Sequence, residues 1–213
     1  MKKMYLAAML IAAISFSACL KDNAPTGDKN NEGDKPEPQP TEVSVVLNEI
    51  NGDIKFIELY NKSDKEVVLD GWFLLKDEDA TDEVISDLEV ATAAAKWTGT
   101  KDVKVPAKGH LVLWSYKSGD PRKDEADAAL IINSGLSDKQ AVKLVLLTSE
   151  GKVADTFIRG DENCVFGDTQ LPQNKEADFS RVPDGTGEWV YAVPTIGTAN
   201  GVKTGDIEQT PAE

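Results

Sequence analysis

The chain has 213 residues, and its 23 lysines and arginines are outnumbered by 37 aspartates and glutamates, for a formal net charge of −14. This balance opposes nucleic acid and anionic lipid surfaces as partners, because both are polyanions that bind through Lys and Arg. With two cysteines and one histidine, the chain lacks the framework of paired cysteines that stabilises small secreted domains.

The first residues have the form of a secretory signal. Lys2 and Lys3 precede a short apolar run over residues 4–16, and small residues then lead directly to Cys19. The run is shorter than the roughly 20 apolar residues that a membrane span needs. The pattern resembles the lipobox of bacterial lipoproteins, in which this cysteine is acylated and becomes the new N-terminus; the alternative is an ordinary signal peptide with an incidental cysteine. We expect residues 1–18 to be removed and Cys19 to anchor the protein to a membrane without spanning it.

A polar segment follows the cysteine. Residues 20–23 resemble the short signals that send lipoproteins of some diderm bacteria to the surface of the outer membrane, with the periplasmic face as the alternative. Residues 23–40 contain no aromatic or branched aliphatic side chain, so they have nothing to bury and are expected to stay disordered. Residues 19–40 are therefore interpreted as a tether. Loss of Lys2 and Lys3 with the signal leaves 21 basic against 37 acidic residues, a net charge of −16.

Short apolar runs between turn residues dominate the rest of the chain, which is long enough for one domain over residues 41–202. The β-branched and large apolar residues predict strands, which we place at 43–50, 55–61, 65–69, 72–75, 110–114, 129–132, 142–147 and 152–158. Residues 106–109 and 148–151 predict tight turns, with Gly151 in the left-handed position. Many short strands without alternating helices indicate an all-β fold, a β-sandwich. Residues 203–213 form an acidic tail that we expect to be flexible.

One insertion interrupts the strands, between residues 77 and 104. Residues 86–89 resemble a capping box ahead of residues 90–96, which favours a short helix or an ordered loop. Asp77, Asp79 and Asp82 could offer oxygen ligands to Ca²⁺. Their spacing does not match an EF-hand, and a solvated acidic loop is the favoured interpretation.

The remaining reactive side chains do not form a catalytic pattern. Cys164 has apolar neighbours and is expected to be an inert buried thiol; a nucleophile would need a base such as His110, and nothing in the sequence brings the two together. Glu49, Glu58 and Arg181 lie in strand-like segments, where a structural ion pair is favoured over acid-base work.

The four tryptophans divide into two pairs. Trp72 follows Gly71 and Trp189 follows Gly187-Glu188, and packing is the expected role of both rings. Trp97 and Trp114 flank the insertion and could form an aromatic platform for a sugar or a peptide, although burial in the core is favoured for each ring taken singly.

Several motifs occur together in an order that resembles the lamin-tail domain. They are VLNEI at 46–50, FIELYNKSDKEVVLDGWFL at 56–74, VPAKGHLVLW at 105–114, LSDKQAVKLVLLTSEGKVADTF at 136–157, SRVPDGTGEW at 180–189 and PTIGTAN at 194–200. The resemblance covers residues 43–201 and implies an immunoglobulin-like β-sandwich without a shared active site. The chain departs from the family pattern in the insertion, at 118–127 and at 160–177, and it has no coiled-coil rod.

Three functions are compatible with these features. The favoured one is a lipid-anchored, non-enzymatic module, displayed on the cell surface, that binds protein or glycan as an adhesion or accessory module. The second is a carboxylate- or metal-dependent hydrolase built on the inserted loops. The third is a purely structural component of the cell envelope.

Overall fold

The computed structural model describes residues 43–116, 119–137, 140–160 and 178–201. All described residues belong to one compact unit. The proposed signal, the tether, the acidic tail, Cys19 and Cys164 lie outside the described residues. No helix within the described part has the length and apolarity needed to cross a membrane.

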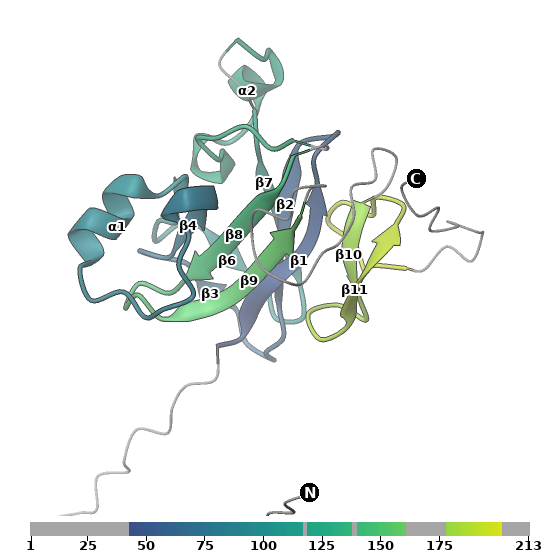
Figure 1. Ribbon diagram of the computed structural model, residues 1–213. Coiled ribbons are helices and arrows are strands. Elements are labelled where there is room, and N and C mark those ends of the chain that lie inside the picture. The colour runs from purple at the N-terminus through teal and green to yellow at the C-terminus, as the bar shows by residue number, and fades with distance from the viewer. Residues whose placement is uncertain (1–42, 117–118, 138–139, 161–177, 202–213) are drawn as a thin grey trace, which may run out of the picture. The chain divides into compact units, whose positions relative to one another are not determined.

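Two antiparallel sheets make up the domain, as the all-β prediction requires. The five-stranded sheet has the order β11-β10-β1-β2-β7, the four-stranded sheet has the order β5-β4-β8-β9, and β3 pairs with β6 alone (Figure 1). The strands are Val45–Asn51 (β1), Phe56–Asn61 (β2), Val67–Val68 (β3), Phe73–Lys76 (β4), Trp97–Thr98 (β5), Lys104–Val105 (β6), His110–Trp114 (β7), Val142–Leu147 (β8), Val153–Arg159 (β9), Asp178–Val182 (β10) and Glu188–Ala192 (β11).

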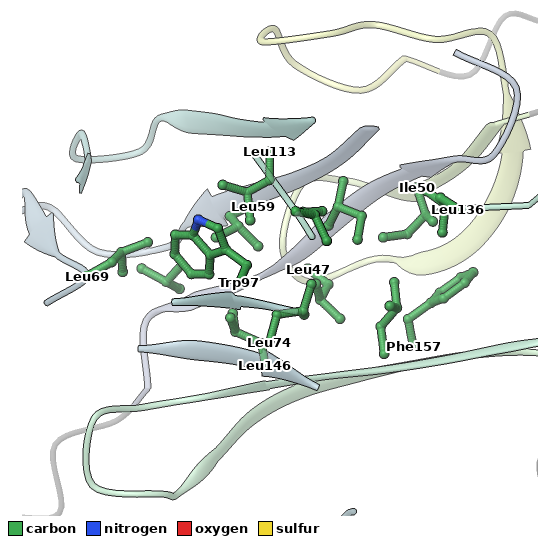
Figure 2. Close-up of a cluster of buried hydrophobic side chains, with 14 of the residues drawn as sticks. Leu47, Ile50, Leu59, Leu69, Leu74, Trp97, Leu113, Leu136, Leu146 and Phe157 are labelled. Carbon is green, nitrogen blue, oxygen red and sulfur yellow. The ribbon is translucent and has the colours of Figure 1, made fainter. Parts of the chain in front are cut away.

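The core lies between the inner faces of these sheets. Alternate residues of each strand enter it, so Leu47 and Leu59 from one sheet meet Leu74 and Leu146 from the other, with Trp97 among them (Figure 2). All five side chains are at most 4 % exposed. This arrangement follows directly from the period of two in the sequence, because successive side chains of a strand point to opposite faces.

The insertion adds a second, smaller core on the outer face of the four-stranded sheet. Its helix α1 (Leu88–Ala94) begins after Asp87, whose side chain accepts a hydrogen bond from Val90 N. Leu88 and its neighbours pack on Phe73, Leu75, Val145 and Leu147. The predicted helix is confirmed, with Asp87 as the capping residue. Figure 1 shows α1 beside β4.

Of the predicted strands, the one placed at 129–132 is wrong. The structure has a 3₁₀ helix, η2 (Ala128–Leu130), followed by a single parallel bridge between Ile131 and Trp114. The side chain of Asp127 accepts a hydrogen bond from Ala129 N and so caps this turn. A local side-chain to backbone bond of this kind competes with strand pairing. Two further short helices, η1 (Asp77–Asp79) and α2 (Arg122–Glu125), were not expected.

The predicted turns form as expected. Gly109 N donates to the carbonyl of Pro106, and Gly151 N donates to the carbonyl of Thr148. Gly151 has a φ of 73°, in the left-handed region that glycine tolerates best. A Cβ there would lie 2.4 Å from the carbonyl oxygen of Ile85, so this glycine also lets the insertion pack against the β8–β9 hairpin.

Candidate functional site

A β-bulge in β1 turns two consecutive polar residues toward the outer face of the five-stranded sheet. The pairing of β1 with β2 shifts between Leu47 and Glu49, which leaves Asn48 as the extra residue. Leu47 and Ile50 both lie in the core, so the bulge accommodates Asn48 and Glu49 between two inward-facing residues. Both polar side chains are fully buried, and buried polar groups need hydrogen-bond partners.

The end of the described chain supplies those partners. We call residues 194–200 the C-terminal clasp. Thr195 donates to Glu49 twice, from its backbone N to Oε1 at 2.8 Å and from Oγ1 to Oε2 at 3.1 Å. Gly197 N donates to Oε2 of Glu58 at 2.6 Å, and Asn200 Nδ2 donates to the carbonyl of Asn48 at 3.1 Å. Glu49 and Glu58 face each other across β1 and β2, and the clasp therefore spans two buried carboxylates.

The turn between β10 and β11 adds further hydrogen bonds to this network. Gly185 N donates to Oδ1 of Asn48 at 2.8 Å, and Asn48 Nδ2 donates both to Oε1 of Glu58 at 3.0 Å and to Oδ1 of Asp184 at 3.1 Å. Asn200 N also donates to Oδ1 of Asp184, at 3.0 Å. Asn48 is thus the amide that joins β1, β2, the turn and the clasp.

His110, on β7, lies at the edge of the same network. Its Nε2 is 3.4 Å from Oδ2 of Asp184 and 3.9 Å from Oε1 of Glu58, and the side chain is 11 % exposed. This nitrogen is buried and makes no hydrogen bond. The ring packs against Tyr60, with 4.9 Å between centroids. Nothing in the sequence groups His110 with Glu58, because the two residues are 52 positions apart.

The electrostatics of this network centre on Glu58. Burial raises the pKa of its carboxyl to about 7, the hydrogen bonds from Asn48 and Gly197 partly oppose that rise, and the nearby carboxylates of Glu49 and Asp184 add to it. Burial is the main cause of the raised pKa, because a carboxylate with no exposed surface loses its hydration. Among the described residues, the charged groups that act on Glu58 are the carboxylates of Glu49 and Asp184, and the imidazole of His110 lies beside them.

The ion pair expected among Glu49, Glu58 and Arg181 forms with a different acid. Arg181 Nη2 lies 3.0 Å from Oδ1 of Asp155, while its Nε donates to the carbonyl of Leu47. The two glutamates hold the clasp instead. Arg181 also stacks over Trp189 at 4.6 Å. Burial raises the pKa of Asp155, against the lowering effect of the Arg181 charge.

The acidic residues considered for Ca²⁺ each meet a lysine. Asp77 pairs with Lys76, Asp79 with Lys96 at 2.8 Å, and Asp82 with Lys143 at 3.0 Å. No group of three or more His, Cys, Asp or Glu side chains in the described ranges has a geometry that could hold a metal ion. These aspartates therefore connect the insertion to the ends of β4, β5 and β8.

The proposed aromatic platform of Trp97 and Trp114 does not form. Trp97 is 4 % exposed, lies in the main core and donates from Nε1 to the carbonyl of Ala129 at 2.8 Å. Trp114 instead stacks on Tyr116, with 5.5 Å between centroids and 15° between planes. The other pair pack as expected: Trp72 and Trp189 are partly buried against the main core.

Sequence reasoning missed the partners that the chain itself supplies. Asp155 and Asp184 each lie more than 100 residues from their partners on β1, and separation along the sequence does not report distance in space. The only signal for Asp184 was its place in the Pro-Asp-Gly turn, and the signal for the clasp was its content of Thr, Gly and Asn.

Comparison with protein families identifies a match. The model of the family described as Lamin Tail Domain matches residues 38–161, which is more than half of the chain. The match includes β1 to β9, and the motifs of β10, β11 and the clasp lie beyond it. No protein in the curated set matches. The two-sheet architecture and the family match agree, and the chain belongs to the lamin tail domain family, whose domain is in general a non-catalytic module.

Proposed function

We propose that this protein is a lipid-anchored surface protein whose lamin tail domain binds a protein or glycan as an adhesion or accessory module. The proposal rests on what the buried polar groups bind. In the described part of the chain, the carboxylates of the one acidic cluster that contains a histidine accept hydrogen bonds from the C-terminal clasp. Its carboxylates act on the protein's own backbone, which suits a scaffold for recognition better than a reaction centre.

The membrane anchor rests on the N-terminal sequence. A charged start and a short apolar run form a secretory signal, and the two small residues before Cys19 resemble the lipobox of bacterial lipoproteins. Acyl chains at Cys19 give stable anchoring. The polar residues 23–40, at roughly 3 Å each when extended, would allow the domain to stand some tens of ångströms from the lipid.

The insertion is the surface that we assign to recognition. Val84 and Val90 are 68 % and 66 % exposed, and both belong to the segment that departs from the family pattern. Exposed apolar side chains next to charged ones are common in protein-binding surfaces. Glu83 and Glu89 are exposed beside them, so this surface favours partners with basic groups.

The first experiment tests where the protein is located and whether it carries lipid. Intact cells are treated with protease and probed with antibody against residues 41–201, and the Cys19→Ser variant is compared for incorporation of labelled fatty acid. Digestion on whole cells and loss of label in Cys19→Ser are expected. A domain that is cleaved only after lysis would move the search for partners to the periplasm, and label retained by Cys19→Ser would contradict lipid attachment at this residue.

The second experiment tests recognition. The Cys19→Ser chain is applied to arrays of glycans and of surface proteins, beside a Val84→Ser/Val90→Ser variant. Val68→Ser, which alters a 44 % exposed valine on β3, is the matched control. We expect the double variant to lose binding and the control to retain it. Binding that is unaffected by the double variant would exclude the insertion as the recognition surface.

The hydrolase alternative is tested separately. Panels of glycan, ester, phosphate and peptide substrates are assayed with and without Ca²⁺ or Zn²⁺. Turnover that survives purification would overturn the non-catalytic proposal. A purely structural role in the envelope would show itself as stable copurification with envelope proteins without binding to the arrays.

A further inference from the structure

We propose that Glu58 forms a proton-controlled lock on the C-terminal clasp: a proton carried by its carboxyl group keeps the clasp docked, and loss of that proton loosens it.

The lock is built from charges of one sign. Glu49 and Glu58 are directly opposite each other on β1 and β2, where like charges destabilise a strand pair. Asp184 joins them through Asn48, which donates to both Glu58 and Asp184. Placing three ionised carboxylates in one buried network is unfavourable, because each loses its hydration and repels the other two.

The groups that face Glu58 include a single cationic candidate. They come from β1 (Asn48, Glu49), β7 (His110), the β10–β11 turn (Asp184) and the clasp (Gly197). The clasp itself contains no charged residue. The guanidinium of Arg181 points away, to Asp155 and Leu47. Among the described residues, the titratable groups that face Glu58 are acidic apart from His110, so binding a proton relieves the repulsion in the network.

Both oxygens of Glu58 are already engaged by donors of the network. Oε2 accepts from Gly197 and Oε1 accepts from Asn48. Nε2 of His110, which is buried and makes no hydrogen bond, lies 3.9 Å from Oε1 and 3.4 Å from Asp184. When the Glu58 carboxyl carries a proton, each oxygen keeps a lone pair that can accept the hydrogen bond from Asn48 or Gly197.

The direction of the effect follows from burial. With the clasp docked, Glu58 is fully buried and its pKa is about 7, whereas its ordinary value is 4.5. Opening the clasp removes the hydrogen bond from Gly197 but lets water reach the carboxyl, and loss of hydration is the larger of these effects. The open form therefore releases the proton more easily, so docking weakens as the pH rises from about 4.5 to about 7 and then stays weak.

Amide hydrogen exchange measured by NMR tests the lock on the Cys19→Ser chain. The protection factors of Gly197 and Thr195, corrected for intrinsic exchange at each pH, should fall on the order of 50-fold between pH 5 and pH 8 if the open form titrates near the ordinary value. In Glu58→Gln, which cannot ionise at this position, protection should be independent of pH. Glu66→Gln, which removes a half-exposed charge paired with Lys104, should behave as the parent does.

The reciprocal measurement keeps the test decisive if Glu58→Gln fails to fold. Gly197 has a φ of 72°, which proline cannot adopt, so Gly197→Pro removes the donor and undocks the clasp. The carboxyl carbon resonance of Glu58 should titrate near pH 7 in the parent and closer to its ordinary value in Gly197→Pro, because coupling between two sites is mutual. Protection that is constant or rises with pH, or a Glu58 titration that is unchanged in Gly197→Pro, would overturn the proposal.

Discussion

Arg181 and Asp155 come from different sheets and meet across one edge of the sandwich. Arg181 Nη2 lies 3.0 Å from Oδ1 of Asp155, and the two residues also satisfy the backbone of Leu47 at the bulge. Asp155 Oδ2 accepts from Leu47 N at 3.0 Å, while Arg181 Nε donates to the carbonyl of Leu47 at 3.0 Å. The pair thus provides hydrogen-bond partners for backbone groups of β1 that have no strand partner at this point.

Asp155→Ala should destabilise the domain by about 3 kcal/mol, because it leaves both a mostly buried guanidinium and a backbone N–H without their acceptor. Urea unfolding followed by circular dichroism measures the loss. Glu66→Ala breaks a half-exposed pair with Lys104 and should change the free energy of unfolding by less than about 1 kcal/mol. Equal effects of the two substitutions would contradict the structural role of Asp155.

Gly151→Ala should destabilise by about 2 kcal/mol. The substitution strains a residue with a φ of 73° and forces its Cβ against the carbonyl of Ile85. Gly119→Ala is the matched control, since its φ is 84° but no atom lies within 4 Å of the added Cβ. The difference in unfolding free energy between the two variants isolates the contact between the insertion and the hairpin, and we expect Gly151→Ala to be the more harmful.

Trp97→Phe should destabilise by about 2 kcal/mol, because it removes part of a buried ring and leaves the carbonyl of Ala129 without its indole donor. Its loss should also remove the most blue-shifted part of the tryptophan emission. Trp114→Phe, at a partly buried position, should cost less than about 1 kcal/mol. If Trp114→Phe were the more damaging, the assignment of Trp97 to the core would be contradicted.

The dependence of the domain's stability on pH should reflect the ionisation of Glu58. Its folded pKa of about 7 lies above its ordinary value of 4.5, so the ionised form is penalised in the folded state. This penalty is absent below about pH 4.5, grows up to about pH 7 and then reaches at most about 3 kcal/mol. The unfolding free energy of Glu58→Gln, relative to the parent, should therefore improve between pH 5 and pH 8. If the unfolding free energies of Glu58→Gln and of the parent changed with pH in the same way, this assignment would be refuted.

The sequence predicted the strands whose side chains alternate, since that pattern reports one buried face directly. It missed β5 and β6, which are two residues each, and β10 and β11, whose polar residues hide the alternation. It also predicted a strand at 129–132, where the side chain of Asp127 caps a turn instead.

The candidate site was less predictable than the fold. Glu49, Glu58 and Arg181 were identified as structural residues from their place in strands, but their partners Thr195, Gly197 and Asp155 come from distant segments. Periodicity contains no information on such pairings. Trp97 illustrates the same limit, because a tryptophan beside a loop has the same local sequence whether its ring faces solvent or the core.

The position of the clasp has a consequence for the order of folding. Thr195 satisfies Glu49 across 146 residues, and Gly197 satisfies Glu58 across 139. Contacts this far apart form late, because a long loop must be closed before they can be made. The β1–β2 hairpin therefore holds two carboxylates that stay hydrated until almost the whole domain is available. A nascent chain that lacks residues 194–200 should remain incompletely closed, a state compatible with passage through an export channel before final folding.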